Sequence, residues 1–95
     1  MKRGWVYIMA NRYRGTIYIG VTSSLPHRTM QHRELAGSQF AAKFKCVRLV
    51  YAETHDEIAS AILRERQLKK WNRDWKIRLI EEQNPEWLDR FDDLI

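Results

Sequence analysis

Two short β-rich segments near the N-terminus constrain the fold of this chain more than any other feature. They span residues 5–9 and 16–21 and are rich in β-branched and aromatic side chains. Between them, Asn11 and Gly15 are residue types that favour turns. The pattern therefore predicts an N-terminal β-hairpin.

The hydrophobic pattern also favours one register for this hairpin. Because side chains alternate between the two faces of a strand, the preferred register gathers the aliphatic residues on a single face. It pairs Ile8 with Ile17 and Val6 with Ile19. The same register sets Tyr7 directly opposite Tyr18 on the other face. Paired aromatic residues are commonly a packing contact, but phenols can also bind a phosphate or activate a water if their pKa falls from about 10.

The next part of the chain reads as a helix, a loop and a third strand. Ser24 and Pro26 are typical of a helix start, and the helix that they begin is expected to end at Gly37. Residues 38–44 are expected to form a basic aromatic loop. Residues 47–53 predict a third strand.

Three helical segments are predicted after this strand. Thr54 and Glu57 match a capping box for a helix that continues through Lys70. Residues 75–80 predict a short helix, and residues 84–91 predict a last amphipathic turn or two. The order ββαβααα indicates an α/β fold, with a small, three-stranded, mostly antiparallel sheet flanked by helices.

Charge is unevenly distributed along the chain, whose length is that of a single domain, residues 1–95. Residues 1–51 carry nine Lys and Arg and one acid, whereas residues 81–95 carry one basic and six acidic residues. Such a one-sided basic field is typical of proteins that bind a polyanion, although a merely soluble basic protein is the alternative. The single cysteine, Cys46, excludes an intramolecular disulfide and indicates a reducing, cytoplasmic location. No apolar run is long enough for a signal peptide or a membrane span.

Glu65 is the most informative residue of the long predicted helix, because it falls on the apolar stripe. The other members of that stripe are Ile58, Ala61, Ile62 and Leu68. A carboxylate on a buried face is costly unless it is paired or binds a cation. A buried ion pair and a divalent cation site are therefore the two interpretations, and Mg²⁺ often binds one carboxylate together with phosphate oxygens. The basic run that follows Glu65 could flank a phosphate backbone.

Arg28 and His32 are four residues apart and therefore lie on the same face of their predicted helix. An arginine fork matches phosphate oxygens, and a histidine can transfer a proton near neutral pH. The alternative is an ordinary solvated helix face.

Taken together, these residues resemble the GIY-YIG nuclease superfamily. Its first half-motif corresponds to Trp5-Val6-Tyr7 and its second, intact, to Tyr18-Ile19-Gly20, with Arg28 ten residues after Tyr18. The segment around Glu65, residues 62–71, is similar to the metal-binding helix of the family. The resemblance covers nearly the whole chain and is greatest to small stand-alone bacterial members, with a domain like the N-terminal catalytic domain of UvrC.

The resemblance implies a metal-dependent DNA endonuclease or nickase that hydrolyses phosphodiester bonds, with structured or damaged DNA as the expected substrate and DNA repair as the setting. Tyr18 would help to activate the attacking water, and Tyr7 would assist it. Arg28 would stabilise charge on the phosphate with His32 beside it, and Glu65 would hold one Mg²⁺ or Mn²⁺. DNA contacts are expected from Arg28, Lys43, Lys69, Lys70 and Arg73, and Gly20 is expected to be structural.

Two alternatives to an active nuclease stay open. One is a DNA-binding module of the same fold with weak or no turnover, and the other is a protein-interaction domain. Three positions depart from the family pattern. Trp5 replaces a glycine, Val21 replaces a lysine of some members, and Asn72 is the nearest candidate for a downstream asparagine.

Overall fold

The computed structural model of the protein describes residues 2–35 and 38–94, and its centre is a three-stranded antiparallel sheet. The strands are β1 (Gly4–Ala10), β2 (Ile17–Thr22) and β3 (Arg48–His55). Their order is β2-β1-β3, so β1 is central and β2 is an edge strand. The predicted α/β fold with a small antiparallel sheet is therefore confirmed.

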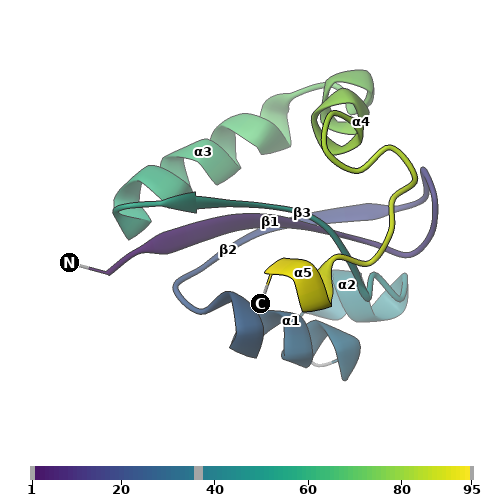
Figure 1. Ribbon diagram of the computed structural model, residues 1–95, viewed down its shortest axis with the longest axis horizontal. Helices are drawn as coiled ribbons and strands as arrows, with labels where there is room; N and C mark the ends of the chain where they lie inside the picture. The colour runs from purple at the N-terminus through teal and green to yellow at the C-terminus, as the bar shows by residue number, and fades with distance from the viewer. Residues whose placement is uncertain (1, 36–37, 95) are drawn as a thin grey trace.

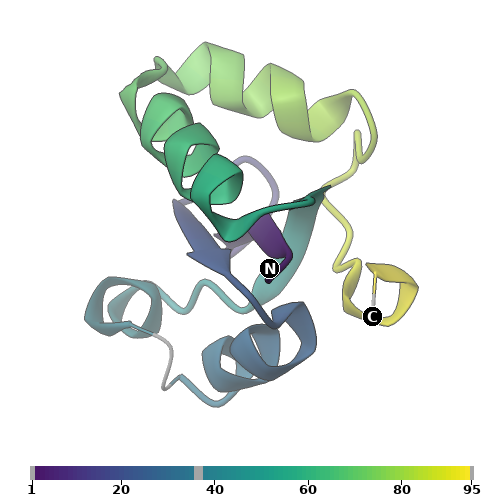
Figure 2. The same ribbon diagram turned by 90° about the vertical axis from the view of Figure 1, so that its left-hand side faces the viewer.

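Helices cover both faces of this sheet (Figure 1). They are α1 (Leu25–Arg33), α2 (Gln39–Lys43), α3 (Ile58–Lys70), α4 (Arg73–Glu81) and α5 (Phe91–Leu94). The turned view in Figure 2 places α3 and α4 on one face, and α1 and α2 on the other. None of the helices in the described part of the chain has the length and apolar character needed to cross a membrane.

The alternation of side chains along β1 divides the core into two clusters. Val6 and Ile8 pack on the α3 and α4 side, in a cluster that includes the buried Trp87. Tyr7 and Met9 point to the α1 and α2 side, in a second cluster. Since all four of these β1 side chains are fully buried, β1 must be apolar on both faces.

The predicted hairpin register is wrong by two residues. Ile8 pairs with Ile19, and Tyr7 pairs with Gly20. The loop explains the shift, because the Asn11 amide N donates to the carbonyl of Thr16, and the Asn11 Oδ1 accepts from the amide of Thr16. Asn11 and Thr16 therefore continue the register of Ala10 and Ile17, with the Asn11 side chain as the acceptor for the Thr16 amide. A shift of two leaves every side chain on its own face, so the predicted faces are correct.

Three local predictions also change. The segment predicted as a loop contains α2, which Ser38 begins by accepting a hydrogen bond from the amide of Ala41. The capping box is wrong, because α3 has Glu57 as its N-cap and no side-chain cap. Helix α4 begins at Arg73, earlier than predicted, and the element order is ββααβααα. The expected helix end at Gly37 lies outside the described residues.

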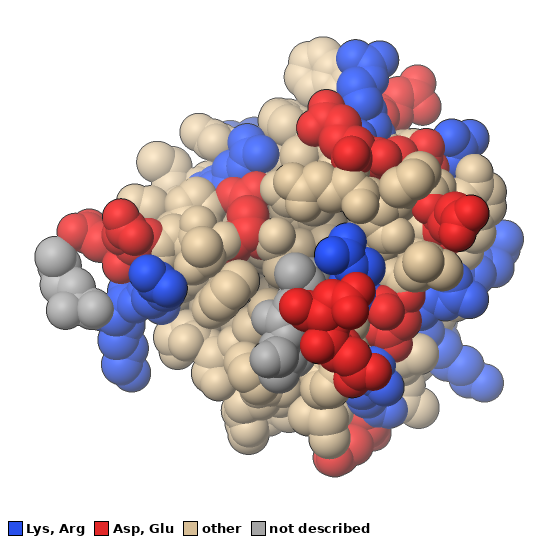
Figure 3. All heavy atoms as spheres, viewed as in Figure 1, with Lys and Arg blue, Asp and Glu red and all other residues tan. Residues whose placement is uncertain are grey.

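The C-terminal segment is tied to the hairpin loop. The Arg14 side chain donates two hydrogen bonds of 2.7 Å to the carboxylate of Glu81, which also accepts one from the Trp87 indole. The guanidinium of Arg73 donates to the carbonyls of Arg14 and Gly15. The acidic C-terminal residues therefore neutralise part of the basic N-terminal half. Figure 3 shows acidic side chains gathered near α5.

Candidate active site

Tyr7, on the central strand, is the residue around which the site is built. Gly20 lies directly opposite it on β2, and a Cβ atom at Gly20 would come within 2.4 Å of the Tyr7 Cζ and Oη atoms. The glycine therefore makes room for the Tyr7 ring, which is fully buried. Tyr18 is paired with Met9 and is diagonal to Tyr7, with 6.3 Å between the two ring centroids.

The hydroxyl of Tyr7 joins two residues of α1. Its Oη lies 2.9 Å from the Nε2 of His32 and accepts a 3.2 Å hydrogen bond from the Nε of Arg28. Arg28 and His32 are one helical turn apart, so a single phenol oxygen can reach both side chains. These contacts fix the position of α1 over the hairpin.

Burial sets the protonation of this cluster. It raises the pKa of Tyr7 to about 12, although the neighbouring Arg28 opposes the rise. It lowers the pKa of His32 to about 4, and the charge of Arg28 adds to this effect. The hydrogen bond to Tyr7 raises the pKa of Arg28. At neutral pH the cluster therefore holds a protonated phenol, a neutral imidazole and a fixed positive charge.

Tyr18 and Arg28 form the accessible side of the cluster, since both are partly exposed. The Tyr18 ring lies 5.2 Å from the His32 ring. The Nη1 of Arg28 donates to Gln31, a residue that sequence reasoning did not single out although its spacing from Arg28 on a helix could have indicated it. Tyr18 also lies close enough to raise the pKa of Arg28, and within the described residues the Nη2 is not used by Tyr7 or Gln31. It is therefore the nitrogen that a phosphate could approach.

Glu65 belongs to α3, on the opposite face of the sheet from α1. Its side chain is 15% exposed, and its Oε2 lies 3.4 Å from the Nζ of Lys69. In residues 2–35 and 38–94, no hydrogen bond joins Glu65 to the tyrosine cluster. Ile62 is 37% exposed, so it does not belong to the buried stripe, whereas Ala61 and Leu68 are fully buried. Glu65 thus borders the buried face of its helix.

The carboxylate of Glu65 fits one kind of metal site. In the described part of the chain, no three His, Cys, Asp or Glu side chains gather where they could hold an ion together. A site made of several side chains does not fit these residues. A magnesium-like site does fit, because such an ion needs one carboxylate and takes its other ligands from water and substrate phosphate.

The residues expected to contact DNA are divided between the two helical layers. Arg28 and Lys43 belong to α1 and α2, whereas Lys69 and Lys70 end α3 and Arg73 begins α4. The Nη2 of Arg73 already donates to two carbonyls of the hairpin loop. A polyanion that contacts both layers must therefore pass an edge of the sheet.

Asn72, the candidate for the family's downstream asparagine, has a structural role here. Its side-chain oxygen accepts a 3.0 Å hydrogen bond from the amide of Trp75 and so caps α4. Asn72 therefore does not join the tyrosine cluster.

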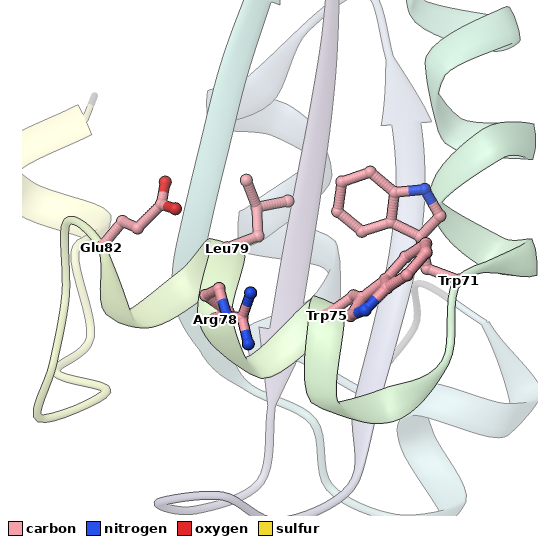
Figure 4. Close-up of a pocket in the computed structure, with 5 residues that line it drawn as sticks. All are labelled: Trp71, Trp75, Arg78, Leu79 and Glu82. Carbon is pink, nitrogen blue, oxygen red and sulfur yellow. The ribbon is translucent and has the colours of Figure 1, made fainter.

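A separate pocket of about 200 Å³ lies on α4 and the end of α3 (Figure 4). Two tryptophans, Trp71 and Trp75, form one wall, and the remaining lining residues are Arg78, Leu79 and Glu82. None of the tyrosine-cluster residues lines it. Sequence reasoning did not predict this pocket.

We expect Gly20→Ala to lower the free energy of unfolding by about 1–3 kcal/mol, the usual cost of overpacking a core. Without this contact, replacing glycine by alanine in a strand should stabilise the fold. The sign of the change in unfolding free energy therefore tests the contact with Tyr7. Urea denaturation of both single variants and the double variant with Tyr7→Ala provides the measurement. In the Tyr7→Ala background, Gly20→Ala should be neutral or stabilising. Equal destabilisation in both backgrounds would contradict the contact.

We expect His32 to make stability depend on pH. The unfolded histidine takes up a proton near pH 6.5, whereas folded His32 resists protonation until about pH 4. Stability is therefore complete above pH 6.5 and falls as pH decreases through this window, by on the order of 3 kcal/mol. Urea denaturation from pH 7 to 5 should give a shallower pH dependence for His32→Gln than for the wild type. His27→Gln, at an exposed position of the same helix, should retain the wild-type slope.

Comparison with known proteins identifies the family of this chain. The profile of the GIY-YIG catalytic domain matches residues 3–78. A "UPF0213 protein" of Syntrophus aciditrophicus is 33% identical over 87 residues, which are 90% of this chain and 98% of that protein. A "UPF0213 protein" of Staphylococcus saprophyticus is 29% identical over 82 residues, 86% of this chain and 99% of its own length. No solved structure matches the chain. The chain therefore belongs to the GIY-YIG catalytic domain family, which has a nuclease fold.

Proposed function

We propose that this protein is a metal-dependent DNA endonuclease or nickase that hydrolyses phosphodiester bonds in structured or damaged DNA. The observation that carries the proposal is the cluster in which the Tyr7 hydroxyl joins Arg28 to His32, with Tyr18 beside them at a partly exposed position. The basic N-terminal half supports a polyanionic substrate. The family supports nuclease chemistry.

Arg28 binds the scissile phosphate. Its Nε and Nη1 are held by Tyr7 and Gln31, so the guanidinium is oriented before the substrate arrives. The Nη2 then donates to a phosphate oxygen and stabilises the charge that develops there. A donor aligned in advance is effective because it needs no reorganisation during the reaction.

Tyr18 is the phenol that reaches the substrate, and it helps to activate the attacking water. Tyr7 is a positioning residue, because its buried hydroxyl keeps its proton at neutral pH and serves to hold Arg28 and His32. The neutral His32 can exchange hydrogen bonds with Tyr7 without carrying a second positive charge into the site.

Glu65 is the residue that would hold Mg²⁺ or Mn²⁺. When bound there, such a cation would neutralise phosphate charge and favour attack by water. Lys69 pairs with the Oε2 of Glu65, so this contact must loosen if both carboxylate oxygens are to be used. Glu65 and Tyr18 lie on opposite faces of the sheet. In this proposal the substrate phosphate therefore lies at the edge strand β2, against which α3 also packs.

The proposed setting is DNA repair in the cytoplasm, with residues 1–95 acting as a single domain. Cys46 is a buried free thiol, and burial raises its pKa, which suits a reducing compartment.

We expect cleavage of branched or nicked DNA in the presence of Mg²⁺ or Mn²⁺, and none in chelator. Tyr18→Phe, Arg28→Ala and Glu65→Gln should each lower the rate by about 100-fold or more, because each removes a group that acts on the reacting phosphate or water. Matched controls are Tyr13→Phe in the hairpin loop and Glu57→Gln at the exposed start of α3, which should cleave normally. Unchanged cleavage by Glu65→Gln would exclude Glu65 as the metal ligand.

The second candidate function is a DNA-binding module with weak or no turnover. One observation favours this candidate. Glu65 pairs with Lys69 and, within the described residues, forms no hydrogen bond with Tyr18. The two candidates share an electrostatic DNA contact and differ in cleavage.

We expect DNA affinity to fall steeply with added salt, because bound phosphates release counterions. Replacing Lys43 or Lys70 by alanine should reduce the slope of log affinity against log salt by about 1, the contribution of one phosphate contact. Titration of a labelled duplex over a range of salt concentrations provides the measurement. Affinity that does not change with salt would exclude both DNA-binding candidates.

A further inference from the structure

A row of aromatic rings leads outward from the tyrosine cluster. The Tyr18 ring, 5.2 Å from that of His32, lies 6.5 Å from the ring of Phe40, and the two planes are tilted by 31°. Phe40 in turn lies 4.8 Å from Phe44. Because Phe40 and Phe44 both belong to the α2 region, this short helix extends the site along the surface.

The outer two rings are unusually accessible for phenylalanine. Phe40 is 47% exposed and Phe44 is 39% exposed, although the rest of the row becomes progressively more buried toward His32. The two rings are tilted by 48° to each other, and together they form a contiguous exposed apolar surface beside the site, a feature typical of interaction surfaces.

The charge around these rings selects the kind of ligand. The Nζ of Lys43 lies 5.5 Å from the centroid of Phe44. Lys45 is also exposed, and no acidic residue occurs in the sequence from residue 35 to residue 52. A ligand that combines a flat aromatic group with negative charge matches this surface, and a nucleotide has both features.

We propose that Phe40 and Phe44 form a stacking platform for an unpaired nucleobase next to the phosphate that Arg28 binds. This inference rests on the proposed nuclease function and specifies its substrate. Bases within a duplex are already stacked on their neighbours and have no free face, whereas bases in a single strand, flap or bulge do. The platform thus selects DNA with unpaired bases at the cleavage site. Lys43 and Lys45 contact the adjoining phosphates.

Binding measured without divalent ions tests the platform independently of cleavage. The probes are a labelled oligothymidylate, an abasic strand of the same length and a duplex. The wild type should bind the oligothymidylate more tightly than the abasic strand, because both strands carry the same charge but only one carries bases. The double variant Phe40→Ala and Phe44→Ala should lose about tenfold in affinity for the oligothymidylate. Its affinity for the abasic strand should stay the same.

Two further substitutions separate stacking from structural support. Phe40→Trp should keep the affinity for oligothymidylate, because tryptophan provides a larger π-face. Phe40→Leu should bind oligothymidylate more weakly, because leucine keeps the apolar packing of α2 but has no aromatic ring. Thermal unfolding should be similar for both variants. The control is Trp75→Ala, which removes an aromatic ring 52% exposed on the other side of the sheet and should leave the affinity for oligothymidylate unchanged.

Three results would overturn the platform. The first is equal wild-type affinity for oligothymidylate and the abasic strand. The second is full affinity in Phe40→Leu, which would make the ring only a packing residue. The third is a loss in Trp75→Ala, which would place the base in the pocket of Figure 4. In each case metal-dependent cleavage by the wild type would still support the nuclease proposal. If the wild type shows normal base-dependent binding but no metal-dependent cleavage, the platform proposal would stand and the nuclease proposal would be contradicted.

Discussion

The close contact between Tyr7 and Gly20 determines how the rest of the site is arranged. The ring extends over the neighbouring strand because position 20 has no side chain, and its hydroxyl therefore lies directly over β2. A buried hydroxyl requires hydrogen-bond partners, and here Arg28 and His32 provide them. Helix α1 is thereby fixed to the sheet by polar contacts as well as by Leu25 in the core.

The same contact separates the two phenols by role. Tyr7 is enclosed and holds other groups, whereas Tyr18 remains accessible at the edge strand. The edge position is important because α3, which carries Glu65, lies on the other face of the sheet. Groups from two separate layers can act on one phosphate only where the sheet ends. The location of Tyr18 on β2 therefore connects the two halves of the proposed chemistry.

Patterns that depend on local alternation were predictable from the sequence. The three strands, the faces of Tyr7 and Tyr18, and the long helix through Lys70 follow from side-chain periodicity. The exact strand pairing did not follow, because the hydrogen bonds of Asn11 to Thr16 set the loop length, and a shift of two residues keeps the same hydrophobic pattern.

Contacts between distant segments were not predictable in the same way. A capping-box motif at residues 54–57 had the right residue types but lay outside the helix that forms. Helix α2 was missed because five residues give too little periodicity to recognise. The burial of Glu65 was predicted from its helical position, but its pairing with Lys69 and its distance from the tyrosine cluster depend on how α3 packs on the sheet.

The tie between the hairpin loop and α4 affects the order in which the chain can fold. Arg14 and Glu81 are 67 residues apart, and the amide of Arg90 donates to the carbonyl of Leu49. Contacts of such long sequence separation form slowly because a large loop must close first. During synthesis the hairpin emerges before Arg73 and Glu81, the residues that hold its loop, have been made. Until α3 and α4 have been made, the apolar face with Val6 and Ile8 lacks its cover, so the nascent chain is prone to aggregation during this interval.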